Sequence, residues 1–121
     1  MKLAVVLAAA MALIATPPLA AAHAMLERAT PRVGEIVQAP PTQISLAFSE
    51  SVEAVLCRVT LTDMHGGVIP LGPATTSAST RRVLAAPVRA VLGPGRYRVS
   101  WRAVSIDSHV TQGVFTFTVR P

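Results

Sequence analysis

Two side chains that can bind a metal ion, Asp107 and His109, stand two positions apart near the end of this chain of 121 residues. Residues two apart in an extended strand point to the same side, so a carboxylate oxygen and an imidazole nitrogen would converge there on one ion. Two ligands alone hold a metal poorly, and a third has to come from elsewhere. A lone Asp-x-His pair is also common as a hydrogen-bonded pair within a loop, and that structural interpretation stays open at this point.

The third candidate ligand is His23, which follows a segment with the features of a secretory signal peptide. Residues 1–22 carry a positive charge at Lys2, followed by an apolar run over 3–15. After two prolines, the segment ends in three alanines. The run is shorter than the about 20 residues that a membrane helix needs, and small residues are typical of a cleavage site. We therefore predict that residues 1–22 are removed and not kept as an anchor.

The position of the cut decides whether His23 is available. Cleavage after Ala22 leaves 99 residues, 23–121, which is enough for a single β-sandwich domain. A competing cut after Ala24 would discard His23 and start the chain at Met25. No second apolar run of membrane-spanning length follows, so we expect that the mature protein does not span a membrane.

As the first residue of the mature chain, His23 would offer its free α-amine and its imidazole Nδ1, which close a chelate ring on one metal. The imidazole of His109 and a carboxylate oxygen of Asp107 complete a set of three nitrogens and one oxygen. Tetragonal ligation by nitrogen and oxygen suits Cu(II), whereas zinc favours a tetrahedron. The chain has one cysteine and four methionines, so soft ligands for Cu(I) are scarce.

Short alternating apolar runs indicate a fold made of β-strands. The runs expected to form strands, separated by Gly- and Pro-containing turns, cover residues 25–30, 43–48, 55–61, 81–86, 96–102 and 114–119. In the third run the spacing places Val55 and Cys57 on the core face. No helical period follows residue 22, so the sequence predicts an all-β fold, a two-sheet antiparallel sandwich of about seven strands.

Charge and cysteine content argue against several functions. The chain has 11 Lys+Arg against 6 Asp+Glu, and without Lys2 the ten remaining bases are all arginines scattered along the sequence, so we expect no nucleic-acid partner. Cys57 is the only cysteine, which excludes an intramolecular disulfide and a cysteine metal motif. Ser105, Asp107 and His109 do not form a hydrolase triad, because Asp and not His lies between the other two.

The mature chain resembles the CopC family, also called the CopC/YobA type, of periplasmic copper-resistance proteins. The matching segments are ATPRVGE (29–35), LAFSESVE (46–53), LGPGRYRVSWRAVSIDSH (92–109) and GVFTFTV (113–119), together with a His after the signal segment. The most specific is Trp-Arg-x-x-Ser-x-Asp-x-His. The resemblance implies a Greek-key sandwich, immunoglobulin-like or cupredoxin-like, that carries one Cu(II) site.

Carried over to this chain, the resemblance implies that His23, Asp107 and His109 are the copper ligands. Glu50 falls where some members place a further carboxylate, and its alternative role is an exposed acid in a turn. Some relatives have a second, Cu(I) site in a Met-rich loop; here that region has only Met64 and His65, so we expect that site to be absent or weak. Arg102 is a candidate to orient Asp107, and Trp101 and Phe115 are expected to wall the site or fill the core beneath it.

The resemblance further implies a periplasmic Cu(II) carrier or buffer for copper homeostasis and resistance, and not an enzyme. It implies a CopD-like inner-membrane copper transport protein as partner, which we expect to be a separate chain, and we expect a monomer. Two other functions stay open. A copper-dependent oxidative enzyme with an N-terminal histidine brace would turn over a reductant with oxygen. A metal-free immunoglobulin-like interaction domain would show no copper-dependent stability.

Overall fold

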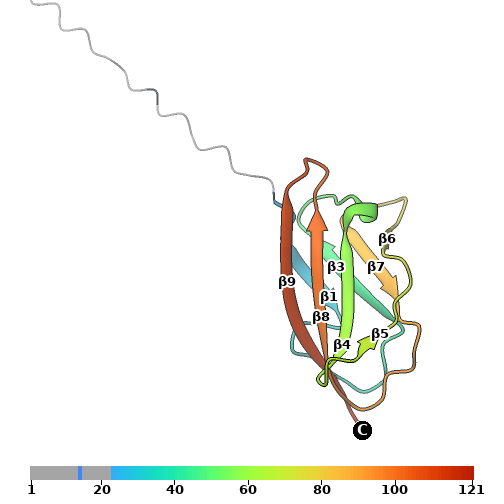
Figure 1. Cartoon of the computed structure of the whole chain (residues 1–121). Coiled ribbons are helices and arrows are strands. Elements are labelled where there is room, and N and C mark those ends of the chain that lie inside the picture. Colours follow the sequence, from blue (N-terminus) through green and yellow to red (C-terminus); the bar gives the residue numbers. More distant parts are fainter. Residues whose placement is uncertain (1–13, 15–22) are drawn as a thin grey trace, which may run out of the picture.

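Apolar side chains alternate along the strands and fill the space between two sheets. The structure, a computed structural model, describes Ile14 and residues 23–121. One sheet has the strand order β1-β3-β7-β6 and the other β2-β9-β8-β4-β5, and the five-stranded sheet is the nearer layer in Figure 1. The strands are β1 (Leu26–Thr30), β2 (Ile36–Val37), β3 (Gln43–Phe48), β4 (Arg58–Asp63), β5 (Val68–Ile69), β6 (Thr75–Thr76), β7 (Val83–Pro87), β8 (Gly95–Val104) and β9 (Val110–Val119).

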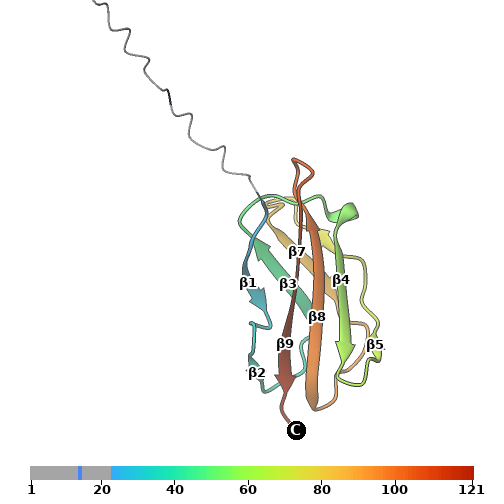
Figure 2. The same ribbon diagram turned by 60° about the vertical axis from the view of Figure 1, so that its left-hand side comes forward.

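The predicted all-β sandwich is confirmed, and its strands pair antiparallel with one exception. The short strand β2 runs parallel to the end of β9, where Figure 2 shows it beside the C-terminus. Three of the nine strands, β2, β5 and β6, have only two residues each. They were not predicted, because two residues show no alternation, and they pair only where a longer strand offers a free edge.

The core lies between β3 on one side and β8 and β9 on the other. Leu46 and Phe48 of β3 and Val99 of β8 are almost fully buried. Trp101 is half-buried, and its ring meets Phe48 of the opposite sheet edge-on, with centroids 5.3 Å apart. This arrangement confirms that Trp101 packs inward and not on an exposed aromatic surface.

Gly113 shows how closely β8 and β9 approach around this ring. It lies directly opposite Trp101, and a Cβ atom at Gly113 would stand 2.6 Å from the indole ring. The absence of a side chain on β9 therefore leaves the space that the tryptophan occupies.

The prediction for residues 55–61 is wrong at its start. Residues Ala54–Leu56 form a single 3₁₀ turn, η1, and Val55 is 91% exposed instead of facing the core. The strand begins only at Arg58, and Cys57, which is half-buried, donates its thiol hydrogen to the carbonyl of Glu53. The apolar residues alternate through η1 and on into β4, which is why the sequence predicts a single strand here.

The predicted signal segment, residues 1–22, lies outside the described residues apart from Ile14, and it stays a prediction. Within the described part of the chain, no helix has the length and apolarity that crossing a bilayer requires.

Candidate metal centre

The β8–β9 hairpin carries Asp107 and His109 at one end of the sandwich, away from the C-terminus (Figure 1). Asp107 and His109 do not lie in the extended strand that their spacing predicts, because residues 106–108 form a turn in which Ser108 has a φ of 69°. The two side chains nevertheless converge, because the backbone amide of Ser105 donates to the carbonyl of His109 at 2.9 Å and closes the turn.

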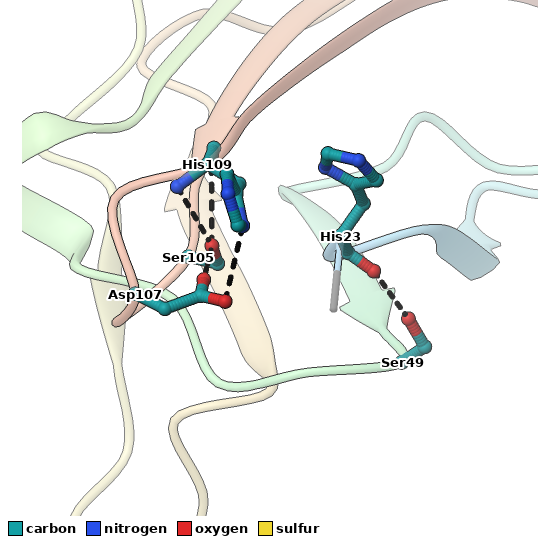
Figure 3. Close-up of polar contacts among 5 residues, drawn as sticks. All are labelled: His23, Ser49, Ser105, Asp107 and His109. Atoms are coloured by element: carbon teal, nitrogen blue, oxygen red, sulfur yellow. Dashed lines mark hydrogen bonds and ion pairs between the residues drawn. The ribbon is translucent and has the colours of Figure 1, made fainter. Parts of the chain in front are cut away.

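Ser105 organises this turn from below. It is the buried polar residue of the described core, 2% exposed, and its Oγ accepts a hydrogen bond from the His109 amide at 3.1 Å. The hydroxyl also contacts Asp107 Oδ1 and lies 3.2 Å from the His109 carbonyl. One buried oxygen therefore fixes both candidate ligands, as Figure 3 shows.

Asp107 and His109 also bind each other. The distance from His109 Nδ1 to Asp107 Oδ2 is 3.0 Å, and both side chains are about half exposed. The hydrogen bond from Ser105, followed by the neighbouring imidazole, lowers the pKa of Asp107 below its ordinary value. The carboxylate is therefore held in its charged, metal-binding form, and His109 Nε2 has no hydrogen-bond partner among the described residues.

His23 is brought to the hairpin by hydrogen bonds to its backbone neighbours. Ser49 Oγ, just after β3, donates to the His23 carbonyl at 3.2 Å and accepts from the Met25 amide at 2.9 Å. From the other sheet, Thr111 Oγ1 donates to the Ala24 carbonyl at 2.7 Å. The rings of His23 and His109 consequently lie with centroids 4.9 Å apart, on facing sides of the gap in Figure 3.

Glu50 lines the same pocket as Asp107. Together with Ser51, Ser105, Ile106 and Asp107 it lines an open pocket of about 230 Å³. Its place beside the candidate ligand Asp107 agrees with the additional carboxylate that the family resemblance implies. Within the described chain, no hydrogen bond joins Glu50 to His23, Asp107 or His109.

The histidine and carboxylate side chains alone do not complete a site. Among the described residues no three His, Cys, Asp or Glu side chains are already arranged to hold a metal ion. The predicted set of three nitrogens and one oxygen includes the α-amine of His23, which cleavage between Ala22 and His23 would free. In that predicted set, the α-amine is the donor that the side chains do not supply.

One smaller prediction was wrong, and one alternative was decided. Arg102 does not orient Asp107, because its Nη1 donates to the Leu56 carbonyl at 3.4 Å, and the partners of the carboxylate are Ser105 and His109. Phe115 is buried in the core cluster, which confirms the predicted alternative that it fills the core and does not wall the site. The positioning roles of Ser49, Ser105 and Thr111 were missed; only Ser105, within Trp-Arg-x-x-Ser-x-Asp-x-His, had a sequence signal.

The predicted weakness of a Cu(I) site has a geometric counterpart. Met64 and His65 lie in the exposed turn after β4, and the end of β4 pairs with the start of β8. The hairpin with Asp107 follows the other end of β8, and Met25 lies there beside Ser49. The two methionines of the described region at 25 and 64 are therefore at opposite ends of the sandwich.

Comparison with known proteins gives a consistent family. Residues 26–120 match the CopC domain model. YobA from Escherichia coli strain K12 is 36% identical over 99 residues, which cover 82% of this chain and 80% of that protein. Copper resistance protein C from Escherichia coli is 34% identical over 107 residues, 84% of each chain, and the protein of the same name from Pseudomonas syringae pv. tomato is 32% identical, again over 84% of each chain.

Solved structures give the same answer. CopC from Methylosinus trichosporium OB3b superposes with a TM-score of 0.77 at 30% identity and covers 82% of this chain and 95% of its own. PcoC, described as a methionine-rich copper resistance protein from Escherichia coli, superposes with a TM-score of 0.72 at 32% identity and covers 82% and 100%. With a matching domain model, relatives above 30% identity and this fold, the chain belongs to the CopC family.

Proposed function

We propose that the mature protein binds one Cu(II) ion as cargo between its N-terminus and the β8–β9 hairpin. The ligands are the α-amine and imidazole of His23, the imidazole of His109 and the carboxylate of Asp107, and Glu50 is an additional candidate. The observation that carries the proposal is the 4.9 Å separation of the His23 and His109 rings beside the Asp107 carboxylate. The copper-resistance relatives support the choice of metal.

The donor chemistry favours the oxidised ion. Three nitrogens and one carboxylate oxygen suit Cu(II), whereas Cu(I) is selected by thiolate and thioether sulfur. Met25 is 60% exposed beside the site, and Met64 is at the other end of the sandwich. A Cu(I) site is therefore proposed to be absent or weak, which contrasts with the PcoC relative that is described as methionine-rich.

The role that follows is that of a periplasmic carrier or buffer without enzymatic turnover. A shallow, half-exposed site lets copper enter and leave, and the carboxylate occupies a position that an oxidative enzyme would keep open for oxygen. The proposed recipient or donor is a CopD-like inner-membrane protein. In aerated solution with ascorbate, the copper-loaded protein is expected to consume no more oxygen than the same copper bound to a glycine buffer; faster consumption would favour the enzyme.

The decisive experiment joins a mass measurement with a copper titration. Intact mass of the exported protein should correspond to a chain that starts at His23. His23→Ala should then weaken Cu(II) binding by roughly two orders of magnitude or more, because the chelating imidazole is lost from a site of four donors. The matched control is His65→Ala, an exposed histidine at the opposite end, which should leave the affinity unchanged.

Two results would contradict this proposal. A mature chain that begins at Met25 would lack the chelating residue altogether. Equal affinities of the His23→Ala and His65→Ala proteins would show that copper binds without the N-terminal ring.

A further inference from the structure

The outer face of the five-stranded sheet gathers four arginines that are scattered in the sequence. Arg96, Arg98 and Arg102 alternate with buried residues along β8, and Arg58 of β4 lies directly opposite Arg102. All four side chains are exposed. Cross-strand register, which the sequence alone does not give, therefore produces a basic surface where no basic run exists; we call these four residues the arginine face.

Among the residues that the structure describes, no carboxylate forms an ion pair with the arginine face. Within strands β2, β4, β5, β8 and β9 the one acid is Asp63, which pairs with the inward-facing Tyr97 and accepts hydrogen bonds from the amides of its own turn. The ion pairs of the described chain are Arg81 with Glu53 and His109 with Asp107. The residues between the arginines are chiefly hydroxyl and amide side chains, such as Thr60, Ser100 and Gln112.

Two of the arginines are placed where they repel each other. Side chains directly opposite across antiparallel strands have Cβ atoms about 4.5–5.5 Å apart, and like charges there are destabilising. Arg58 and Arg102 hold this relationship. They line a hollow of about 190 Å³ together with Thr60, Ser100, Trp101 and Gln112. Two guanidinium groups beside hydroxyl and amide donors are a suitable arrangement for a carboxylate, which accepts paired hydrogen bonds from arginine.

We propose that the arginine face is a docking surface for a partner protein with an acidic surface. Arginine is enriched at protein interfaces, and the charge of the four side chains suits an acidic surface. An anionic membrane is the less suitable occupant, because interfacial binding inserts aromatic or large aliphatic side chains. Here Tyr97 is buried and the ring of Trp101 packs against Phe48. The aliphatic side chains exposed on this face are limited to Val110 and Val114 of β9 and to Ile36 and Val68 at its edges.

The docking surface adjoins the end of the sheet that carries the candidate metal centre. Arg102 donates to the Leu56 carbonyl of η1, and both η1 and the β8–β9 hairpin lie at this end in Figure 1. A protein seated over Arg58 and Arg102 would thus be next to the site. The proposal does not depend on copper, because none of the four arginines is a candidate metal ligand. The test below accordingly uses metal-free protein.

The test uses the purified, metal-free protein labelled with ¹⁵N and poly-L-glutamate as the acidic probe. Amide shifts are expected in β4, β8 and β9 around the four arginines, and not around Arg28 and Arg32 on the outer face of the other sheet. The variant R58Q/R96Q/R98Q/R102Q should lose about tenfold or more in affinity, since four exposed ion pairs disappear together. The control R28Q/R32Q/R82Q/R89Q removes the same charge elsewhere and should lose about twofold or less.

Folding is checked separately with Arg58→Gln alone. Removing one member of the opposed pair relieves repulsion, so its melting temperature is expected to stay the same or rise, with affinity for poly-L-glutamate reduced. Equal losses in the two quadruple variants, or shifts centred on Arg28 and Arg32, would overturn the proposal. So would face-dependent binding to phosphatidylglycerol vesicles in the absence of face-dependent binding to poly-L-glutamate, which would identify a membrane as the occupant.

Discussion

The imidazole rings of His23 and His109 face each other with centroids 4.9 Å apart and planes tilted by 59°. His23 precedes β1 of the four-stranded sheet, and His109 precedes β9 of the five-stranded sheet. The side-chain hydroxyls of Ser49 and Thr111 hold this arrangement through hydrogen bonds to the backbone of residues 23–25. The fold thus brings the two rings together, although the side chains alone do not complete a metal site.

Loss of the carboxylate should weaken copper binding less than loss of the imidazole. In Asp107→Asn one anionic oxygen is replaced by an amide, whose place water can fill, and we expect the Cu(II) dissociation constant to rise about tenfold. In His109→Ala a nitrogen ligand is removed, and the increase should be larger. Competition titration of both variants checks this order. A greater loss in Asp107→Asn would mean that the carboxylate, and not the imidazole, dominates binding.

Ser105→Ala tests whether the buried hydroxyl positions the ligands. The His109 amide would lose its acceptor in a buried position, which costs about 1–3 kcal/mol of unfolding free energy, and ligand support of this kind affects metal affinity by about 10–100-fold. Urea unfolding and Cu(II) titration measure the two effects. Ser100→Ala is the control, since that hydroxyl is half-buried on β8 and takes part in no side-chain hydrogen bond within the described chain. Unchanged copper affinity in Ser105→Ala would restrict Ser105 to a structural role.

The acid side of the stability profile should contain a contribution from Asp107. Its folded pKa is lower than the unfolded value, chiefly because of the bond from Ser105. This contribution is therefore complete above the unfolded pKa of about 3.9 and disappears as the pH falls through the lower, folded pKa. Carbon-detected NMR titration of metal-free protein should show the Asp107 midpoint rise in Ser105→Ala. A midpoint that does not move would show that another group sets this pKa.

Gly113→Ala should destabilise the sandwich. The new methyl group would stand 2.6 Å from the indole of Trp101, and overpacking of this kind costs about 1–3 kcal/mol, with roughly 4–8 °C of melting temperature for each kcal/mol in a domain of this size. Thermal unfolding followed by Trp101 fluorescence measures the shift. The control is Gly93→Ala, where the added Cβ meets nothing within 4 Å. Equal melting temperatures would mean that the ring can move aside without cost.

The longer strands were predictable from sequence, whereas their partners were not. Gln43–Phe48 is predicted to the residue, because Ile44, Leu46 and Phe48 alternate strictly and the core side of β3 is fully covered. The position of Val55 is predicted wrongly because its spacing continues the alternation of β4, whereas Val55 itself lies in the 3₁₀ turn before that strand. Asp107 and His109 were identified by type, yet their convergence arises from a turn around Ser105. The arginine face was missed, since the pairing of Arg58 with Arg102 is a property of register.

The hydrogen bonds to residues 23–25 come from both layers: Ser49 follows β3 of one sheet, and Thr111 belongs to β9 of the other. An ion held by His23 on one side and by Asp107 and His109 on the other would consequently act as a cross-link that fastens the two layers at their open end. Copper loading should then slow amide hydrogen exchange in β1 and β9 alike, so that the cargo protects the protein that carries it.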